Sequence, residues 1–223
     1  MTPQARIYVW FTVLTGLSLA IIAVASEWRV EPMDLPLYVS LSMITASWKV
    51  RLPGLKGSIS PHFLVVLAGL VQLPMIGALA GLFAGIGVQM LWNSKRRPSG
   101  EQALFNMASL TIAAVSAKWI LTSLLTVLPP GGVGYPLAFL VAACAYFLLN
   151  TLQVSCVICL VEGRRMTVVF DLCHSWAFPY YAAGGVLGWW LSAAGNPMHW
   201  LPWLCVMPLA YLGHRYYRVL VLR

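Results

Sequence analysis

The residue with the clearest chemical potential is Lys118, a basic residue inside the apolar stretch Ala103–Leu128. A charge in a membrane is costly unless it is paired, solvated or neutral. No acidic residue lies within a helical turn of Lys118. Two interpretations are open: the ammonium group contacts a ligand or anion in a cavity that opens outward, or it snorkels or bonds a backbone carbonyl. Trp119 follows directly and joins Lys118 as a candidate ligand contact.

Two amides, Asn106 and Asn150, lie in successive apolar segments. Each must find a hydrogen-bond partner in a membrane, where water is absent. A bridge between helices is the favoured interpretation for both residues. A contact with a bound ligand is the alternative, so Asn106 and Asn150 complete the set of candidate ligand-binding residues.

Metal-ligand residue types also occur close together. Asp171 and His174 are three residues apart, which places them on one face of a helix. Cys156 and Cys159 form a CxxC pair within the apolar run Val154–Val161. A structural zinc site needs four firm ligands. We therefore predict a packed thiol pair, a polar cluster of Asp171 and His174 at the inner membrane edge, and no metal site.

Patterns typical of enzymes are missing from the chain. It has no GxSxG, no HExxH and no GxxxxGK[ST] phosphate-binding loop. The whole chain has six Asp and Glu residues, and three of them fall in one predicted outer loop. We predict a protein that is not an enzyme, with no catalytic residues and no cofactor.

The composition indicates the kind of protein in which these residues lie. Of 223 residues, 60% are hydrophobic and 9% are charged, against roughly 25% charged residues in an average soluble domain. The mean hydropathy is +0.80. A soluble chain of this length cannot bury so much apolar surface, so this composition excludes an ordinary soluble enzyme, a disordered regulator and a disulfide scaffold. We predict an all-α, polytopic transmembrane helix bundle that forms a single integral membrane domain over residues 1–223.

The apolar residues group into eight segments, and about 20 such residues cross a bilayer as a helix. The third and fourth segments are short and are separated only by Pro74. They either both span or form a re-entrant hairpin, so the prediction is eight spans, or six full spans plus a short hairpin. The segments are Ile7–Ala25, Leu35–Trp48, Pro61–Leu73, Met75–Trp92, Ala103–Leu128, Pro136–Val161, Thr167–Ala194 and Trp200–Gly213.

Basic residues set the predicted orientation. With the N-terminus inside, twelve of the 14 Lys and Arg residues fall in inner loops or at the termini, and the outer loops hold Arg29 alone. This positive-inside pattern predicts that both termini are cytoplasmic. It also explains the net charge of +8 without nucleic acid. The twelve are Arg6, Lys49, Arg51, Lys56, Lys95, Arg96, Arg97, Arg164, Arg165, Arg215, Arg218 and Arg223.

A ridge of small residues, Gly77, Gly81 and Gly85, follows the fourth segment at a spacing of four. Small residues let helix backbones approach closely in lipid, where helix pairing depends on packing. Packing inside the bundle is the favoured interpretation. A homodimer face is the alternative.

Five short strings stand out in order along the chain: Trp48–Gly54, Ser94–Pro98, Leu104–Ser109, Leu149–Thr151 and Leu160–Gly163. Taken in this order, they resemble the multi-spanning N-terminal sensor region of bacterial signalling proteins that carry an HD-GYP or GGDEF domain acting on cyclic-di-GMP. The resemblance implies a location in the bacterial inner membrane. The likeness covers roughly residues 35 to 215. It implies an input domain that senses a membrane or external signal and acts through its C-terminal helix. The chain has no HD metal motif and no GGDEF-like motif, so no catalytic residues are implied.

The expected function is therefore a sensory or regulatory membrane module that detects a small molecule or a membrane signal. Its expected partners are membrane lipids, a small apolar ligand, and either a second copy or a cytoplasmic signalling protein. One alternative is a ligand-binding transport subunit, because the size and architecture are similar to those of the substrate-binding subunits of vitamin transporters. Another is an accessory or scaffold subunit of a larger membrane complex.

Overall fold

The computed structural model describes residues 1–27, 35–48, 50–51, 58–92, 98–128, 133–173 and 178–193. These residues are almost entirely helical, which confirms the predicted all-α class. Two short strands, β1 and β2, form an antiparallel pair in which Val50 faces Ile59. The elements are α1 (Pro3–Ser26), α2 (Leu35–Ser47), β1 (Val50–Arg51), β2 (Ser58–Ile59), α3 (His62–Gln72), α4 (Met75–Leu91), α5 (Gly100–Val127), α6 (Gly134–Glu162), α7 (Met166–Cys173) and α8 (Phe178–Ala193).

Three of the described helices, α1, α5 and α6, are long and apolar enough to cross a membrane, with 24, 28 and 29 residues. This agrees with the prediction of a membrane protein. The helices α2, α3 and α4 are shorter, with 13, 11 and 17 residues. At 1.5 Å per residue, α3 is about 17 Å long, whereas the hydrocarbon core is about 30 Å thick.

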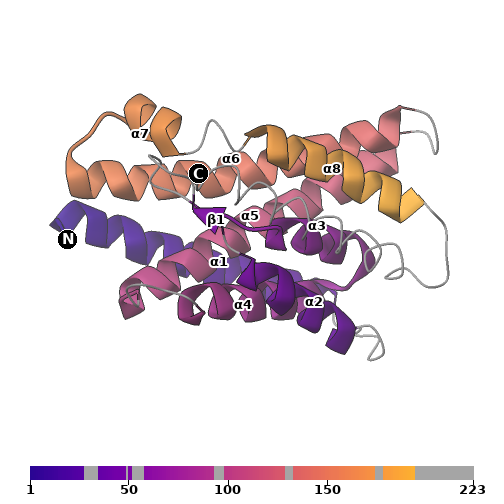
Figure 1. The fold of residues 1–223 in the computed structure, drawn as a ribbon, viewed down its shortest axis with the longest axis horizontal. Helices are drawn as coiled ribbons and strands as arrows, with labels where there is room; N and C mark the ends of the chain where they lie inside the picture. The colour runs from indigo at the N-terminus through magenta and orange to yellow at the C-terminus, as the bar shows by residue number, and fades with distance from the viewer. Residues whose placement is uncertain are drawn as a thin grey trace, which may run out of the picture.

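The long helices lie side by side along the long axis of the molecule (Figure 1). Helix α5 is in the middle, packed against α1 on one side and α6 on the other, and α6 also packs against α8. Helices α1 and α5 approach closely at Gly16, where an added Cβ atom would come within 2.8 Å of the Ala108 backbone. Between α5 and α6, the Ser109 hydroxyl donates a hydrogen bond to Asn150 Oδ1 over 3.3 Å.

The short helices form a compact group in which α2 packs against both α3 and α4. Every residue of α3 from His62 to Leu70 is buried. A membrane accepts irregular backbone only where protein or water surrounds it. The irregular backbone between α3 and α4 includes Leu73, which is buried. Both alternatives, the re-entrant hairpin and two full spans, stay predictions.

Helices α3 and α4 are separated by two extended residues. Leu73 has φ −116° and ψ 151°, and Pro74 has φ −55° and ψ 154°. Proline disfavours the helical conformation in the residue before it and has no N–H to donate. The chain therefore leaves the helix at Leu73 and begins a new one at Met75.

The last two predicted segments are described only in part. The seventh segment, Thr167–Ala194, contains two helices, α7 and α8, with residues 174–177 between them outside the described part. Helix α7 packs against α6, whose last turn ends at Gly163. The eighth segment, Trp200–Gly213, lies outside the described residues.

Candidate functional site

Lys118 is buried in α5, where its side chain is 7% exposed. Its ammonium group donates one hydrogen bond to Glu27 Oε2 over 2.7 Å and another to the Leu73 carbonyl over 2.8 Å. Glu27 directly follows α1, so the acidic partner comes from a different helix. The bond to Leu73 is of the structural kind that the second interpretation of Lys118 describes. A ligand contact stays a prediction.

Glu27 makes a further bond, accepting the backbone N–H of Met75 at Oε2 over 2.9 Å. We refer to Glu27, Lys118 and the backbones of Leu73 and Met75 as the Glu27–Lys118 cluster. Its two charges lie at the helix ends created by Pro74. The carboxylate binds the free N–H at the start of α4, and the ammonium group binds a free carbonyl after α3. Each charge also has the sign that its helix dipole favours.

The two charges differ in their access to the surroundings. The Glu27 side chain is 40% exposed, whereas that of Lys118 is 7% exposed. An ammonium group that is buried needs its partner more than a carboxylate that can be solvated. If the Glu27–Lys118 ion pair were lost, the free-energy cost of an unpaired Lys118 would therefore exceed that of an unpaired Glu27. Glu27 is the member of the cluster that a molecule outside the bundle can reach.

A second buried polar cluster joins α2, α3 and α4. The Ser42 hydroxyl lies 2.8 Å from His62 Nε2 and 2.7 Å from the Gly81 carbonyl. Gln89 Nε2 lies 3.4 Å from His62 Nδ1. A single assignment satisfies all three bonds: Gln89 donates to His62 Nδ1, His62 Nε2–H donates to Ser42, and Ser42 donates to Gly81. His62 is then neutral, and the chain of bonds ties three helices together.

The glycine ridge packs inside this same group. A Cβ atom added at Gly81 would meet the ring of Tyr38, and one added at Gly85 would meet the ring of His62. The Tyr38 hydroxyl donates to the Ala78 carbonyl over 3.3 Å. At Gly77 the neighbours are side chains of Leu35 and Leu73. The ridge thus provides the space for two buried rings, and its use as a homodimer face stays a prediction.

The four candidate ligand contacts are not brought together. Asn150 bonds Ser109, and Trp119 is 43% exposed on the surface of α5. Asn106 lies twelve positions before Lys118, about 18 Å along the helix. It lines a groove of about 340 Å³ between α5 and α6, which Val9 of α1 also borders and whose apolar wall includes Phe105 and Val157.

The predicted polar cluster of Asp171 and His174 cannot be placed, because the Asp171 side chain and all of His174 lie outside the described residues. Within the described part of the chain, no three His, Cys, Asp or Glu side chains converge as they would around a metal ion.

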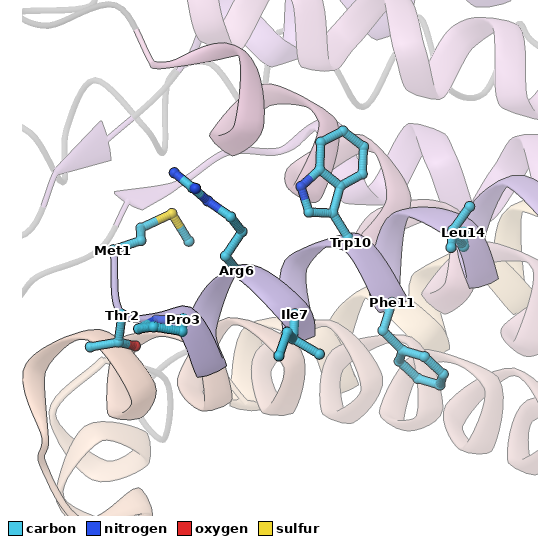
Figure 2. Close-up of a pocket in the computed structure, with 8 residues that line it drawn as sticks. All are labelled: Met1, Thr2, Pro3, Arg6, Ile7, Trp10, Phe11 and Leu14. Atoms are coloured by element: carbon cyan, nitrogen blue, oxygen red, sulfur yellow. The ribbon is translucent and has the colours of Figure 1, made fainter.

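Helix α1 presents an open groove of about 640 Å³ along its first half. Figure 2 shows Arg6 and Trp10 on one side of the helix and Ile7 and Phe11 on the other. Arg6 forms an ion pair of 3.5 Å with Glu101 at the start of α5. This is the polar end of a face that is otherwise apolar.

No family model, no curated protein and no solved structure matches this chain. A functional assignment therefore rests on the chain's own residues.

Sequence reasoning missed three of the residues that the structure brings into these clusters. Glu27 is one of the three acidic residues of a predicted outer loop, and the sequence pattern does not distinguish His62 and Gln89 from other polar residues. The sequence feature that could have pointed to them is a polar residue within or beside an apolar segment. Such a residue is expected to have a hydrogen-bond partner, but the sequence does not identify that partner.

Proposed function

We propose that this chain is a non-enzymatic sensory or regulatory module of the bacterial inner membrane, with both termini in the cytoplasm. The charge asymmetry of the loops supports the orientation, and the long apolar helices α1, α5 and α6 support membrane insertion. The signal acts at the predicted outer end, and the response leaves through the predicted inner end.

The observation that carries this proposal is the Glu27–Lys118 cluster. It joins the end of α1, the break between α3 and α4, and the middle of α5. One of its charges is accessible from outside the bundle. A signal that binds the Glu27 carboxylate would remove the charged partner of Lys118 and free the first N–H of α4 in one step. Binding of a signal at Glu27 would thus alter the packing of all the helices that the Glu27–Lys118 cluster joins.

Helix α4 is the element that would transmit the change. It begins at Met75 in the cluster and ends at Leu91, at the predicted inner side. On its way it packs against α2 through Gly81 and against α3 through Gly85. Because buried rings fill both positions, α4 cannot move without displacing Tyr38 and His62. A displacement at Met75 is therefore expected to spread along the helix as a change between discrete packings.

The test is a distance measurement between spin labels at the inner ends of α4 and α6. Leu91 and Val161 are both exposed and serve as labelling sites after the native cysteines are replaced. In lipid nanodiscs, Glu27→Gln should shift the Leu91–Val161 distance distribution. Glu101→Gln is the matched control, because Glu101 pairs with Arg6, whose side chain is 63% exposed. An unchanged distribution in Glu27→Gln would refute the relay.

The groove between α5 and α6 favours a second candidate function, a ligand-binding transport subunit. The Asn106 amide is exposed at this groove, and Glu101 and Gln102 also line it. Pockets for small molecules combine an apolar wall with a few polar groups in this way. Native mass spectrometry of the purified chain should then release one small molecule per chain, which Asn106→Ala loses. Recovery of lipid alone would argue against this second function.

A further inference from the structure

A groove of about 570 Å³ runs between the last two turns of α1 and the first half of α4. The side chains that line it are all apolar. The lining ends at Ala25 on α1, two residues before Glu27, and at Ile76 on α4. Glu27 accepts the N–H of Met75, the residue directly before Ile76. The carboxylate therefore lies at the end of an apolar groove.

The Glu27 carboxylate has an oxygen left for a further donor. Both hydrogen bonds that it accepts within the described residues, from Lys118 and from Met75, end at Oε2. An ionised carboxylate offers about four lone-pair sites, so Oε1 can accept an N–H or O–H group. Because the Glu27 side chain is 40% exposed, that group can come from outside the bundle.

We propose that this groove binds a membrane lipid whose headgroup carries a primary ammonium group. One acyl chain lies in the groove, where Ile21 of α1 is 61% exposed and offers apolar surface to it. The ammonium group donates a hydrogen bond to Glu27 Oε1. This inference rests on the sensory role proposed above, because it names the class of signal that reaches Glu27.

The charges at this end favour a cationic headgroup. Lys118 neutralises Glu27 within the cluster. The predicted outer loop that follows Glu27 in the sequence contains Arg29, Glu31 and Asp34, which add a net charge of −1. An anionic headgroup would meet that negative charge and bring no donor for Oε1. An ammonium group brings a positive charge and three N–H donors, and bonds between charged partners are the stronger ones.

The same groove connects the lipid to α4, the helix that transmits the change in the proposed relay. The α4 part of its lining runs from Ile76 through Ala80 to Phe83, about 10 Å along the helix. An acyl chain in the groove packs on this part of α4. The ammonium group meanwhile competes with Lys118 for one carboxylate. The lipid thus acts on the start of α4 and on its side together.

The test is native mass spectrometry of the full chain in detergent, titrated with phosphatidylethanolamine or with phosphatidylcholine that has the same acyl chains. The two headgroups share the phosphate and the positive charge, but the quaternary ammonium of phosphatidylcholine has no N–H to donate. Wild type should bind the first phosphatidylethanolamine about tenfold more tightly, as expected for one hydrogen bond to a charged group. Equal affinities would overturn the site, and this comparison needs no variant.

Two variants test the headgroup contact and the groove separately. Glu27→Gln should lose the preference, because a neutral amide is a weaker acceptor for an ammonium group, whereas Glu101→Gln should keep it. Ala80→Leu fills the groove and should weaken both lipids about tenfold, since displacing two methylene groups is sufficient. Its control is Ala145→Leu, at a half-buried alanine of α6 that does not line the groove, and it should bind as wild type does.

Tryptophan fluorescence melting checks that each variant is folded. A preference retained by folded Glu27→Gln would overturn the site, as would an unchanged affinity in Ala80→Leu or an equal loss in Ala145→Leu. A dimer that Ala80→Leu dissociates would also overturn it, because a second copy of the chain would then occupy the groove.

Two independent readouts separate the lipid site from the relay. Lipid affinity reports the site, and the Leu91–Val161 distance reports the relay. If Glu27→Gln shifts that distance while wild type binds both lipids equally, the lipid site is wrong and the relay stands. If wild type prefers phosphatidylethanolamine while Glu27→Gln leaves the distance unchanged, the site stands and the relay is wrong.

Discussion

Removing Glu27 and removing Lys118 are expected to lower the stability of the protein by unequal amounts. Glu27→Ala leaves the Lys118 ammonium group buried with the Leu73 carbonyl as its remaining described partner. Lys118→Met leaves a carboxylate that is 40% exposed and still accepts the Met75 N–H. Since a buried unpaired charge costs more than a partly solvated one, removal of the acid should be the more damaging change.

The magnitudes follow from these environments. Removing one partner of a fully buried ion pair costs about 3–5 kcal/mol. The partial exposure of Glu27 places Glu27→Ala near the lower end, at about 3 kcal/mol. Lys118→Met mainly leaves the Leu73 carbonyl without its described donor, which costs about 1–2 kcal/mol. The double variant removes both charges and should cost no more than Glu27→Ala alone, so the coupling energy is about 1–2 kcal/mol.

The assay is equilibrium unfolding in mixed detergent micelles, followed by tryptophan fluorescence, for the wild type, both single variants and the double variant. Glu101→Gln is the control for removal of a carboxylate whose partner, Arg6, is exposed, and it should cost under about 1 kcal/mol. Additive effects of Glu27→Ala and Lys118→Met, or a larger cost for Lys118→Met, would show that Lys118 does not depend on Glu27 for its stability in the bundle.

Two further predictions concern the group of short helices, with the same unfolding assay. Gly81→Ala places a methyl group against the buried Tyr38 ring and should lower the unfolding free energy by about 1–3 kcal/mol. Its control, Gly87→Ala, places the methyl group in open space and should be neutral or stabilising. Equal effects of the two variants would contradict the packing of α2 on α4. Ser42→Ala removes the hydroxyl between His62 and Gly81 and should cost about 1–3 kcal/mol. The exposed Ser40→Ala is its control, and a cost for Ser42→Ala no larger than that of the control would show that the buried chain of bonds contributes nothing.

Helix positions were predicted well where an apolar run and a helix have the same limits. The predicted segment Met75–Trp92 corresponds to α4, Met75–Leu91, and Leu35–Trp48 corresponds to α2, Leu35–Ser47. The predicted segments fall short where a cap extends the helix into polar sequence. Helix α5 begins at Gly100, before the predicted Ala103, because Ser99 and Gln102 form a capping box.

The partners of the buried polar residues could not be predicted in the same way. The sequence shows that Lys118 needs a partner, but Glu27 lies 91 positions away, beyond a different helix. The same holds for His62, which contacts Ser42 and Gln89 only because α2, α3 and α4 pack together. Helical periodicity determines which residues share a face. The choice of facing helix depends on the packing of the whole bundle.

The proposed sensory role depends on the Glu27–Lys118 pair acting through the two helix ends at Pro74. The most direct measurement is the unfolding free energy of the exchanged variant Glu27→Lys/Lys118→Glu. Exchange preserves the ion pair, but it turns an ammonium group toward the Met75 N–H and a carboxylate toward the Leu73 carbonyl. The exchanged variant should therefore be no more stable than Glu27→Ala. Recovery of wild-type stability would show that charge pairing alone matters, and it would contradict the account.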